Sequence, residues 1–194
     1  SRILPEMMGL VNDCIDNNVF DKELYSKFNV KRGLRDMDGR GVLTGLTSIS
    51  EIRSFTEQNG ALIPSEGKLY YRGIDVETMI EGIEAENRFG FEEVTYLLLF
   101  GKQPSKDNLR VFQKILAKYR TLPTNFVRDV ILKAPSSDLM NTLARSILTL
   151  YAYDENANDI AIPNVLRQSL QLIANFPVLA VYGFWAYNHY IAGK

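Results

Sequence analysis

The chain contains very few of the residues that carry nucleophilic, acid–base or metal-binding chemistry. Its 194 residues include one cysteine, Cys14, and one histidine, His189. A single cysteine excludes an internal disulfide and a Cys-rich metal site, and it is typical of a reducing compartment, so we expect a cytoplasmic protein. Any Ser-His-Asp or Cys-His arrangement would need His189, which lies in an apolar stretch far along the chain from Cys14. We therefore expect a packed, hydrogen-bonded histidine and predict no catalytic residue and no metal ligand here.

The chain also lacks an excess of charge of either sign. Lys and Arg number 22 and Asp and Glu number 23, which gives a net charge of -1 at pH 7. This balance provides no general attraction to nucleic acids or to acidic membranes. The basic run at residues 31–35 is followed at once by Asp36 and Asp38, which is typical of a solvated segment. We predict no nucleic-acid partner and no membrane partner.

Long hydrophobic runs are limited to one stretch near the end of the chain. Residues 176–192 read FPVLAVYGFWAYNHYIA, which is 17 residues. This length is at the lower limit for a membrane span, and polar residues interrupt it, so we interpret it as a buried helix that begins after Pro177. A helix that is apolar on all sides needs cover on all sides. Either earlier helices wrap it, or the covering part belongs to a larger protein.

The first 40 residues are predicted to form short helices and a polar turn. Apolar residues at helical spacing predict a helix over residues 3–16, and Asp21 is a suitable N-cap for a second, shorter one. Residues 36–39 (DMDG) resemble the start of a calcium-binding loop. The fifth and twelfth ligand positions would be Arg40 and Thr47, however, and neither supplies the required carboxylate. We therefore interpret this segment as a turn.

A small β-ribbon is predicted near residues 42–71, and it is the only strand-rich part of the sequence. β-branched residues over 42–56 predict one strand, and Asn59-Gly60 is a hairpin-turn signal. Two further short strands are predicted at 61–63 and 69–71, with a proline and a glycine between them. The rest of the chain predicts an all-α, multi-helical protein.

From residue 75 to residue 192 the sequence predicts a helical core. The expected N-caps are Asp75, Ser105 and Thr124. Gly101 is expected to end a helix over residues 91–100, and Pro163 is expected in the first turn of a later one. The helix over residues 138–151 carries a stripe of Leu139, Leu143, Ile147 and Leu150. The small side chains of Ala144 and Ser146 on this helix would permit close contact with another helix.

Two polar groups in this region have alternative interpretations. Arg72 follows a predicted strand and precedes a helix N-terminus, a position from which an arginine can bind a carboxylate or phosphate. The simpler interpretation is that Arg72 pairs with Asp75 or Glu77 and fixes the turn. Glu92 and Glu93 are adjacent acids, which point in different directions on a helix, and a helix start explains both without catalysis.

Several segments, in register, resemble the N-terminal half of a citrate synthase. The similarity covers nearly the whole chain from about Arg32. It is carried by residues 32–47 (RGLRDMDGRGVLTGLT), 68–76 (KLYYRGIDV), 91–104 (FEEVTYLLLFGKQP), 138–154 and 164–176 (NVLRQSLQLIANF). The resemblance implies that residues 1–194 are the N-terminal part of the large domain, with N-terminal helices over 1–40, the β-ribbon over 42–71 and the helical core over 75–192.

The resemblance also implies a function. Citrate synthases condense acetyl-CoA with oxaloacetate, and their catalytic histidines, aspartate and substrate-binding arginines lie in the second half of a chain about twice as long. We therefore expect this segment to be inactive alone, to need no cofactor, and to form a homodimer through helices in residues 124–152. A 2-methylcitrate synthase, and a non-catalytic helical scaffold or oligomerisation module, are the alternative functions.

Overall fold

The computed structural model describes residues 21, 23–28, 30, 33–36, 39, 41–42 and 47–194. It divides into two compact units, Ser1–Ser48 and Ile49–Lys194, which are described separately. In the first unit, helix α2 spans Glu23–Lys27. The side chain of Asp21 accepts a hydrogen bond of 2.9 Å from the backbone N–H of Glu23, which confirms the predicted N-cap. The helix predicted over residues 3–16 lies outside the described residues.

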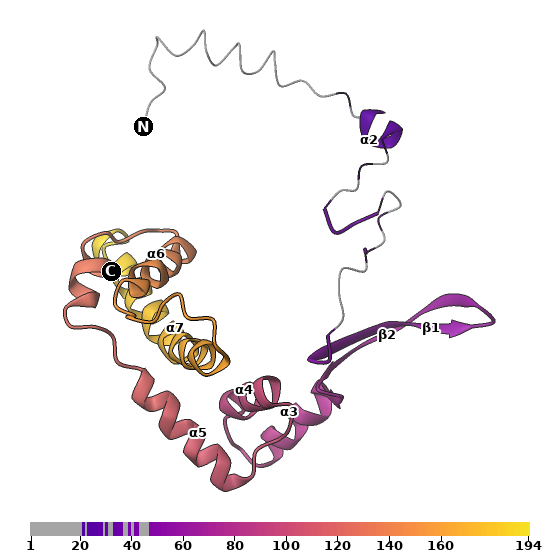
Figure 1. Cartoon of the computed structure of the whole chain (residues 1–194), viewed down its shortest axis with the longest axis horizontal. Helices are drawn as coiled ribbons and strands as arrows, with labels where there is room; N and C mark the ends of the chain where they lie inside the picture. The colour runs from indigo at the N-terminus through magenta and orange to yellow at the C-terminus, as the bar shows by residue number, and fades with distance from the viewer. Residues whose placement is uncertain are drawn as a thin grey trace. The chain divides into compact units, whose positions relative to one another are not determined.

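The second unit begins with an antiparallel hairpin (Figure 1). Strand β1 spans Ser50–Gln58 and β2 spans Ala61–Tyr71, and the two-residue strand β3, Ile74–Asp75, pairs with the end of β2. Asn59 and Gly60 both have positive φ, of 53° and 76°, as the predicted hairpin turn requires. Among the described residues the sheet starts at Ser50, and residues 43–46 of the strand predicted over 42–56 lie outside the described residues.

The two short strands predicted at 61–63 and 69–71 are in fact one continuous strand, β2. Pro64 does not break it, because it pairs with Phe55 at a register shift between Arg53 and Phe55. The ladder is already irregular at a register shift, so a residue without an N–H is tolerated there.

Three helices follow the sheet. Helix α3 spans Val76–Ala85, α4 spans Phe91–Phe100 and α5 spans Lys106–Tyr119. Asp75 accepts a hydrogen bond from Glu77 N at 2.8 Å, and Ser105 accepts one from Asn108 N at 3.2 Å, so both predicted N-caps are confirmed. Gly101 ends α4 in the left-handed conformation, with φ of 75°.

The next turn of helix differs from the prediction. Val127–Leu132 form a π-helix, η2, and Thr124 does not cap it. Asn125 has a φ of 62°, so the chain makes a left-handed step between Thr124 and the helix, and the N-cap geometry is lost. Helix α6 then spans Leu139–Tyr151, within the helix predicted over residues 138–151. Asp138 is its N-cap and accepts a hydrogen bond from Asn141 N at 2.9 Å.

The last helix, α7, is a single element of 29 residues, Ile162–Tyr190, with Pro163 in its first turn. The predicted break at Pro177 is wrong. Pro177 lies on the exposed side of α7, where water can bind the carbonyl that lacks an N–H partner. By length and apolar composition α7 could also cross a membrane, a test that the core helix of a water-soluble protein passes too.

Helix α7 packs against two separate hydrophobic clusters. Its first half contacts α5 in a cluster made of Phe112, Leu116, Leu170 and Ala174. Its second half contacts the η2–α6 region in a cluster made of Phe126, Ile131, Leu179 and Ala186. Outside the small sheet, the regular structure of residues 49–194 is helical, which confirms the predicted all-α class.

Candidate functional site

Of the chemically reactive residues considered in the sequence, the structure describes His189. His189 lies near the end of α7 with its side chain exposed, and its ring meets Tyr190 edge-on at 4.7 Å between centroids. The packed histidine predicted from the sequence is wrong, because this side of α7 is not covered by the described residues. Cys14 lies outside the described residues. Among the residues that the structure describes, no group of three or more His, Cys, Asp or Glu side chains is placed to hold a metal ion.

Arg72 fixes the turn between the hairpin and the helices, but not through the predicted acids. Its guanidinium donates to the backbone carbonyl of Leu98, from Nη2 at 2.8 Å and from Nε at 3.2 Å. The last carbonyls of a helix lack intrahelical partners, so α4 offers an acceptor at this point. The acids named in the prediction, Asp75 and Glu77, are instead in ion-pair distance of Lys68.

Glu92 and Glu93 have structural roles at the start of α4, as predicted. Glu93 forms an ion pair with Arg88, and Glu92 lies 3.7 Å from the guanidinium of Arg120. The two adjacent carboxylates therefore point to different partners. Their positions in the first turn also favour the helix, because negative charge stabilises a helix N-terminus.

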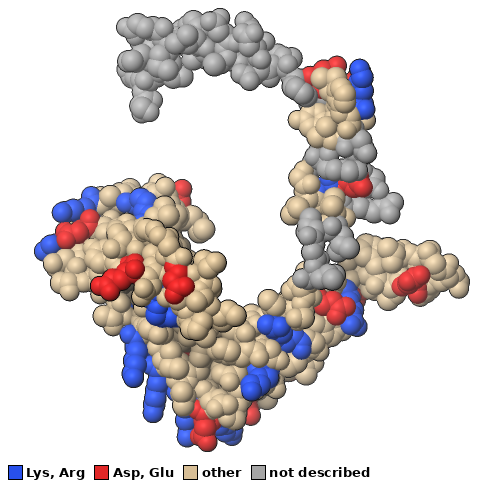
Figure 2. Space-filling model, viewed as in Figure 1, with Lys and Arg blue, Asp and Glu red and all other residues tan. Residues whose placement is uncertain are grey.

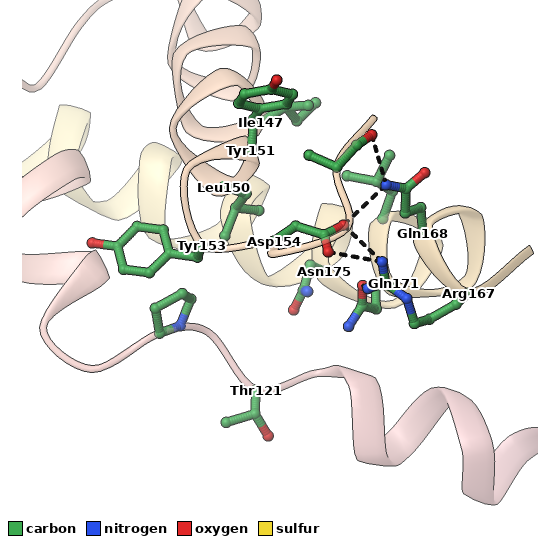
Figure 3. A pocket seen from close by; sticks show the side chains of 13 residues that line it. Thr121, Ile147, Leu150, Tyr151, Tyr153, Asp154, Arg167, Gln168, Gln171 and Asn175 are labelled. Carbon is green, nitrogen blue, oxygen red and sulfur yellow. Dashed lines mark hydrogen bonds and ion pairs between the residues drawn. The ribbon is translucent and has the colours of Figure 1, made fainter. Parts of the chain in front are cut away.

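A cavity lies where the end of α6, the loop over 152–161, the first half of α7 and residues 121–123 meet (Figure 3). Its volume is about 380 Å³. Its lining combines apolar and polar side chains. The apolar ones include Pro123, Ile147, Leu150 and Leu172, and the polar ones, called the polar wall below, include Asp154, Arg167, Gln168, Gln171 and Asn175.

The polar wall is organised around the ion pair between Asp154 and Arg167. Arg167 Nη2 lies 2.8 Å from each carboxylate oxygen of Asp154, and Gln168 Nε2 donates to the same carboxylate at 2.9 Å. These donors, Gln168 foremost and then Arg167, lower the pKa of Asp154. Asp154 is therefore held as an anion whose charge Arg167 balances.

This cluster was missed by the sequence analysis. The acidic loop over 154–159 was recognised, but its partner Arg167 lies 13 residues from Asp154, on the next helix. The hydrophobic and polar patterns of helices and strands relate residues within one element, so they do not indicate a contact between two residues on either side of a loop. The remaining pKa shifts among the described carboxylates have the same direction: Glu51 is lowered by Arg53, and Asp129 is lowered to about 2 by Arg128 and Lys133.

Helices α6 and α7 approach each other closely. Thr142 and Ser146 are buried on α6, and a Cβ atom added to Gly183 of α7 would lie 3.2 Å from Thr142 Cγ2. Both hydroxyl groups donate within α6, Ser146 Oγ to the carbonyl of Thr142 at 2.8 Å and Thr142 Oγ1 to that of Asp138 at 3.3 Å. Of the two small residues predicted to permit close helix contact, Ser146 is buried and Ala144 is exposed.

Each of these helices also exposes an apolar stripe. The α6 stripe consists of Met140, Ala144 and Leu148, and the α7 stripe consists of Val181, Phe184 and Trp185. Met140 and Leu148 are 74% and 75% exposed, and Trp185 is 63% exposed. Acidic and basic side chains are interspersed over the helices on the face drawn in Figure 2. Large exposed apolar patches occur at protein–protein and membrane interaction sites and in ligand-binding grooves.

Comparison with known proteins identifies the family. The family model "Citrate synthase, C-terminal domain" matches residues 34–192. The chain is 26% identical over 154 residues to 2-methylcitrate synthase 1 of Corynebacterium glutamicum, covering 79% of this chain and 35% of that protein. It is 30% identical over 118 residues to the citrate synthase of the same organism, covering 60% of this chain and 25% of that protein.

Solved structures agree with these relatives. The citrate synthase of Pyrobaculum aerophilum superimposes with a TM-score of 0.61 at 26% identity, over 80% of this chain and 39% of that one. That of Thermotoga maritima gives a TM-score of 0.56 at 26% identity, over 85% of this chain and 36% of that one. The chain thus spans about a third of the length of these relatives, and it belongs to the citrate synthase family.

Proposed function

We propose that this chain is the N-terminal portion of a citrate synthase, which condenses acetyl-CoA with oxaloacetate to give citrate and CoA. The match of residues 34–192 to the family model carries the citrate synthase part of the proposal, and the order of the resembling sequence segments supports the N-terminal placement. The reaction requires a base that removes a proton beside the thioester carbonyl and a donor that stabilises the enolate. Asp129 and Asp154 are held as anions by ion pairs, and the ring of His189 meets Tyr190. The segment therefore supplies scaffold rather than chemistry.

The enzymatic proposal is tested on the protein encoded by the whole reading frame that contains this chain. We expect this protein to release CoA from acetyl-CoA when oxaloacetate is present, and we expect the 194-residue chain alone to release none. CoA release by the isolated chain at an enzyme-like rate would overturn its assignment as scaffold. A reading frame that ends at Lys194 would instead favour the non-catalytic scaffold module.

A 2-methylcitrate synthase is the second candidate, because 2-methylcitrate synthase 1 of C. glutamicum is among the relatives that this chain matches. The two enzymes differ in the acyl group that they accept. The same assay with propionyl-CoA in place of acetyl-CoA separates them. A kcat/KM that is higher for propionyl-CoA would assign the protein to the second candidate.

We further propose that the chain forms a homodimer through residues 124–152. Phe126 and Ile131 are not available for this contact, since they are 1% and 0% exposed in the chain's own core. The interface therefore rests on the α6 stripe of Met140, Ala144 and Leu148. Burying such a stripe against a second copy removes apolar surface from water on both partners.

Sedimentation equilibrium tests the dimer. We expect twice the chain mass of 22.0 kDa for the unmodified chain. Leu148→Asp should give the monomer mass, because a charge on the stripe would have to be buried. Val111→Asp is the matched control, since Val111 is 58% exposed on α5, away from the stripe, and this variant should remain dimeric. A monomeric unmodified chain would contradict the proposal.

A further inference from the structure

The hairpin of β1 and β2 is exposed along most of its length (Figure 1). Every residue of β1 except Ser54 is exposed, and so are residues 61–67 of β2. The exposed side chains include large apolar ones, which are Ile52, Phe55, Leu62 and Ile63. A two-stranded hairpin is only marginally stable in water, and a further strand or a helix packed on it adds the stability that it lacks. The hairpin therefore offers a surface for another chain to cover.

Strand β1 presents an open sheet edge. The strand order is β1-β2-β3, so among the described residues β1 pairs on one side only. The irregularity in the ladder lies on β2, which has residues 65–67 where β1 has only Ser54. The two extra residues are an even number, so the side chains of β1 alternate between the two faces without interruption. The outer edge of β2 is less suitable for pairing, because Pro64 has no N–H to donate. An unpaired edge such as that of β1 can bind a strand of another chain.

The residues of β1 complement those of a second, antiparallel copy of β1 when the two-fold axis passes through Phe55. In this register Phe55 lies opposite Phe55 of the second copy, and Arg53 lies opposite Glu57 on each side of the axis. Ser54 lies opposite Thr56, which also occurs twice by symmetry. Aromatic pairs, pairs of opposite charge and hydroxyl pairs are the cross-strand pairs that stabilise antiparallel strands. The sequence of β1 is thus self-complementary in this register.

The charges of β1 disfavour the neighbouring registers. With the axis through Ser54, Glu51 would lie opposite Glu57, and with the axis through Arg53 the two Arg53 side chains would lie opposite each other. Like charges directly opposite each other destabilise a strand pair. Arg53 can bind a second carboxylate, because its Nε and Nη2 donate to Glu51, at 2.6 and 3.1 Å, and Nη1 is left for another acceptor. The charge pattern therefore selects the register centred on Phe55.

We propose that β1 binds β1 of a second copy of this chain, antiparallel and with the two-fold axis at Phe55, so that two hairpins form one continuous sheet. The contact consists of a few side-chain pairs and one strand edge, which makes it a weak interface with a dissociation constant of about 1 mM. At the lower concentrations used for sedimentation, the hairpins are separate and the α6 stripe alone determines the mass. The proposal depends neither on the enzymatic assignment nor on the α6 dimer, since it rests on the residues of β1.

Disulfide trapping at position 55 tests the pairing. Phe55→Cys is made in a Cys14→Ser background, so the chain contains no other thiol. Directly opposite residues of antiparallel strands have Cα atoms about 4.5–5.5 Å apart, which a disulfide can span. Gln58→Cys in the same background is the matched control, because it is exposed on the same strand and its two copies would lie about 20 Å apart. The 194-residue chain is oxidised mildly at about 1 mM, and linked dimers are separated on a non-reducing denaturing gel. We expect at least about tenfold more linked dimer from Phe55→Cys than from Gln58→Cys. Equal yields, or no linked dimer from Phe55→Cys, would overturn the proposal.

A charge variant tests the register. Glu57→Arg, added to the Phe55→Cys chain, places two positive charges opposite each other beside Arg53 and should lower the yield of linked dimer about fivefold or more. Glu66→Arg makes the same change of charge at an exposed position of β2, away from the paired edge, and should leave the yield unchanged. Leu148→Asp should also leave the yield unchanged, so failure of the α6 dimer and failure of the hairpin pairing are distinguishable. Equal yields from the Glu57→Arg and Glu66→Arg chains would refute the register.

Discussion

The close contact between α6 and α7 predicts the effect of a single added methyl group. A Cβ atom at Gly183 would lie 3.2 Å from Thr142 Cγ2, which is tighter than an ordinary van der Waals contact. The side chain of Thr142 is held in place and cannot easily shift. It is 3% exposed, its hydroxyl donates to the carbonyl of Asp138 at 3.3 Å, and it accepts from Arg145 Nη2 at 3.3 Å. We therefore expect Gly183→Ala to destabilise the chain.

Two opposing terms set the size of this effect. Alanine is favoured over glycine in a helix interior by about 1 kcal/mol. Overpacking a well-packed contact costs about 1–3 kcal/mol, so the free energy of unfolding should fall by about 1 kcal/mol. Thr142→Ser removes the Cγ2 methyl and keeps the hydroxyl. The next contacts of the new Cβ are then at 3.8 and 3.9 Å, which is ordinary contact distance. In that background Gly183→Ala should stabilise by about 1 kcal/mol.

The measurement is a double-mutant cycle by urea unfolding, followed by circular dichroism at the helical signal. The four proteins are the unmodified chain, each single variant and the double variant. We expect a coupling energy of about 2 kcal/mol between the two positions, with the sign of the Gly183→Ala effect reversed in the serine background. A Gly183→Ala effect of the same size and sign in both backgrounds would show that the threonine methyl is not what the new side chain meets.

Three further predictions concern other parts of the second unit. Pro177→Ala restores a backbone N–H inside α7 and should raise the free energy of unfolding by about 1–3 kcal/mol, so an unchanged urea midpoint would argue against a cost at this proline. Arg72→Met removes both hydrogen bonds to the Leu98 carbonyl and should lower the free energy of unfolding by about 1–3 kcal/mol, whereas no change would show that the α4 terminus is satisfied otherwise. The pKa of Asp129 is lowered from 3.8 to about 2, so its contribution to stability is complete above pH 3.8 and is lost as pH falls toward 2. The free energy of unfolding of Asp129→Asn should therefore lack the loss that Asp129 causes between pH 3.8 and about 2. If its plot against pH runs parallel to that of the unmodified chain over this range, Asp129 does not stabilise the fold through its ion pairs.

Features that depend on neighbours in sequence were predictable. Asp75 and Ser105 each accept a hydrogen bond from a backbone N–H two or three residues later, so the capping residue and its partner lie within one short segment. The hairpin turn at Asn59-Gly60 is local in the same sense. Thr124 has the same capping chemistry, but the left-handed backbone of Asn125 removes the geometry that capping needs.

Features that depend on tertiary packing were not predictable. Pro177 reads as a helix break, yet α7 continues through it because Ala174 and Leu179, on either side, are anchored in different clusters. Arg72 and Leu98 are 26 residues apart, and nothing in the pattern of the intervening sequence links them. The candidate cavity also depends on tertiary packing, since its polar wall is organised around the ion pair between Asp154 and Arg167, which are 13 residues apart.

The position of α7 in both hydrophobic clusters has a consequence for the order of folding during synthesis. Residues 106–151 leave the ribosome before residues 162–190, yet Phe112 and Leu116 in one cluster and Phe126 and Ile131 in the other all await partners on α7. Neither cluster can close until α7 has emerged. The nascent chain therefore passes through a stage in which two apolar surfaces are open at once, and a chaperone that binds exposed apolar segments would act on it at that stage.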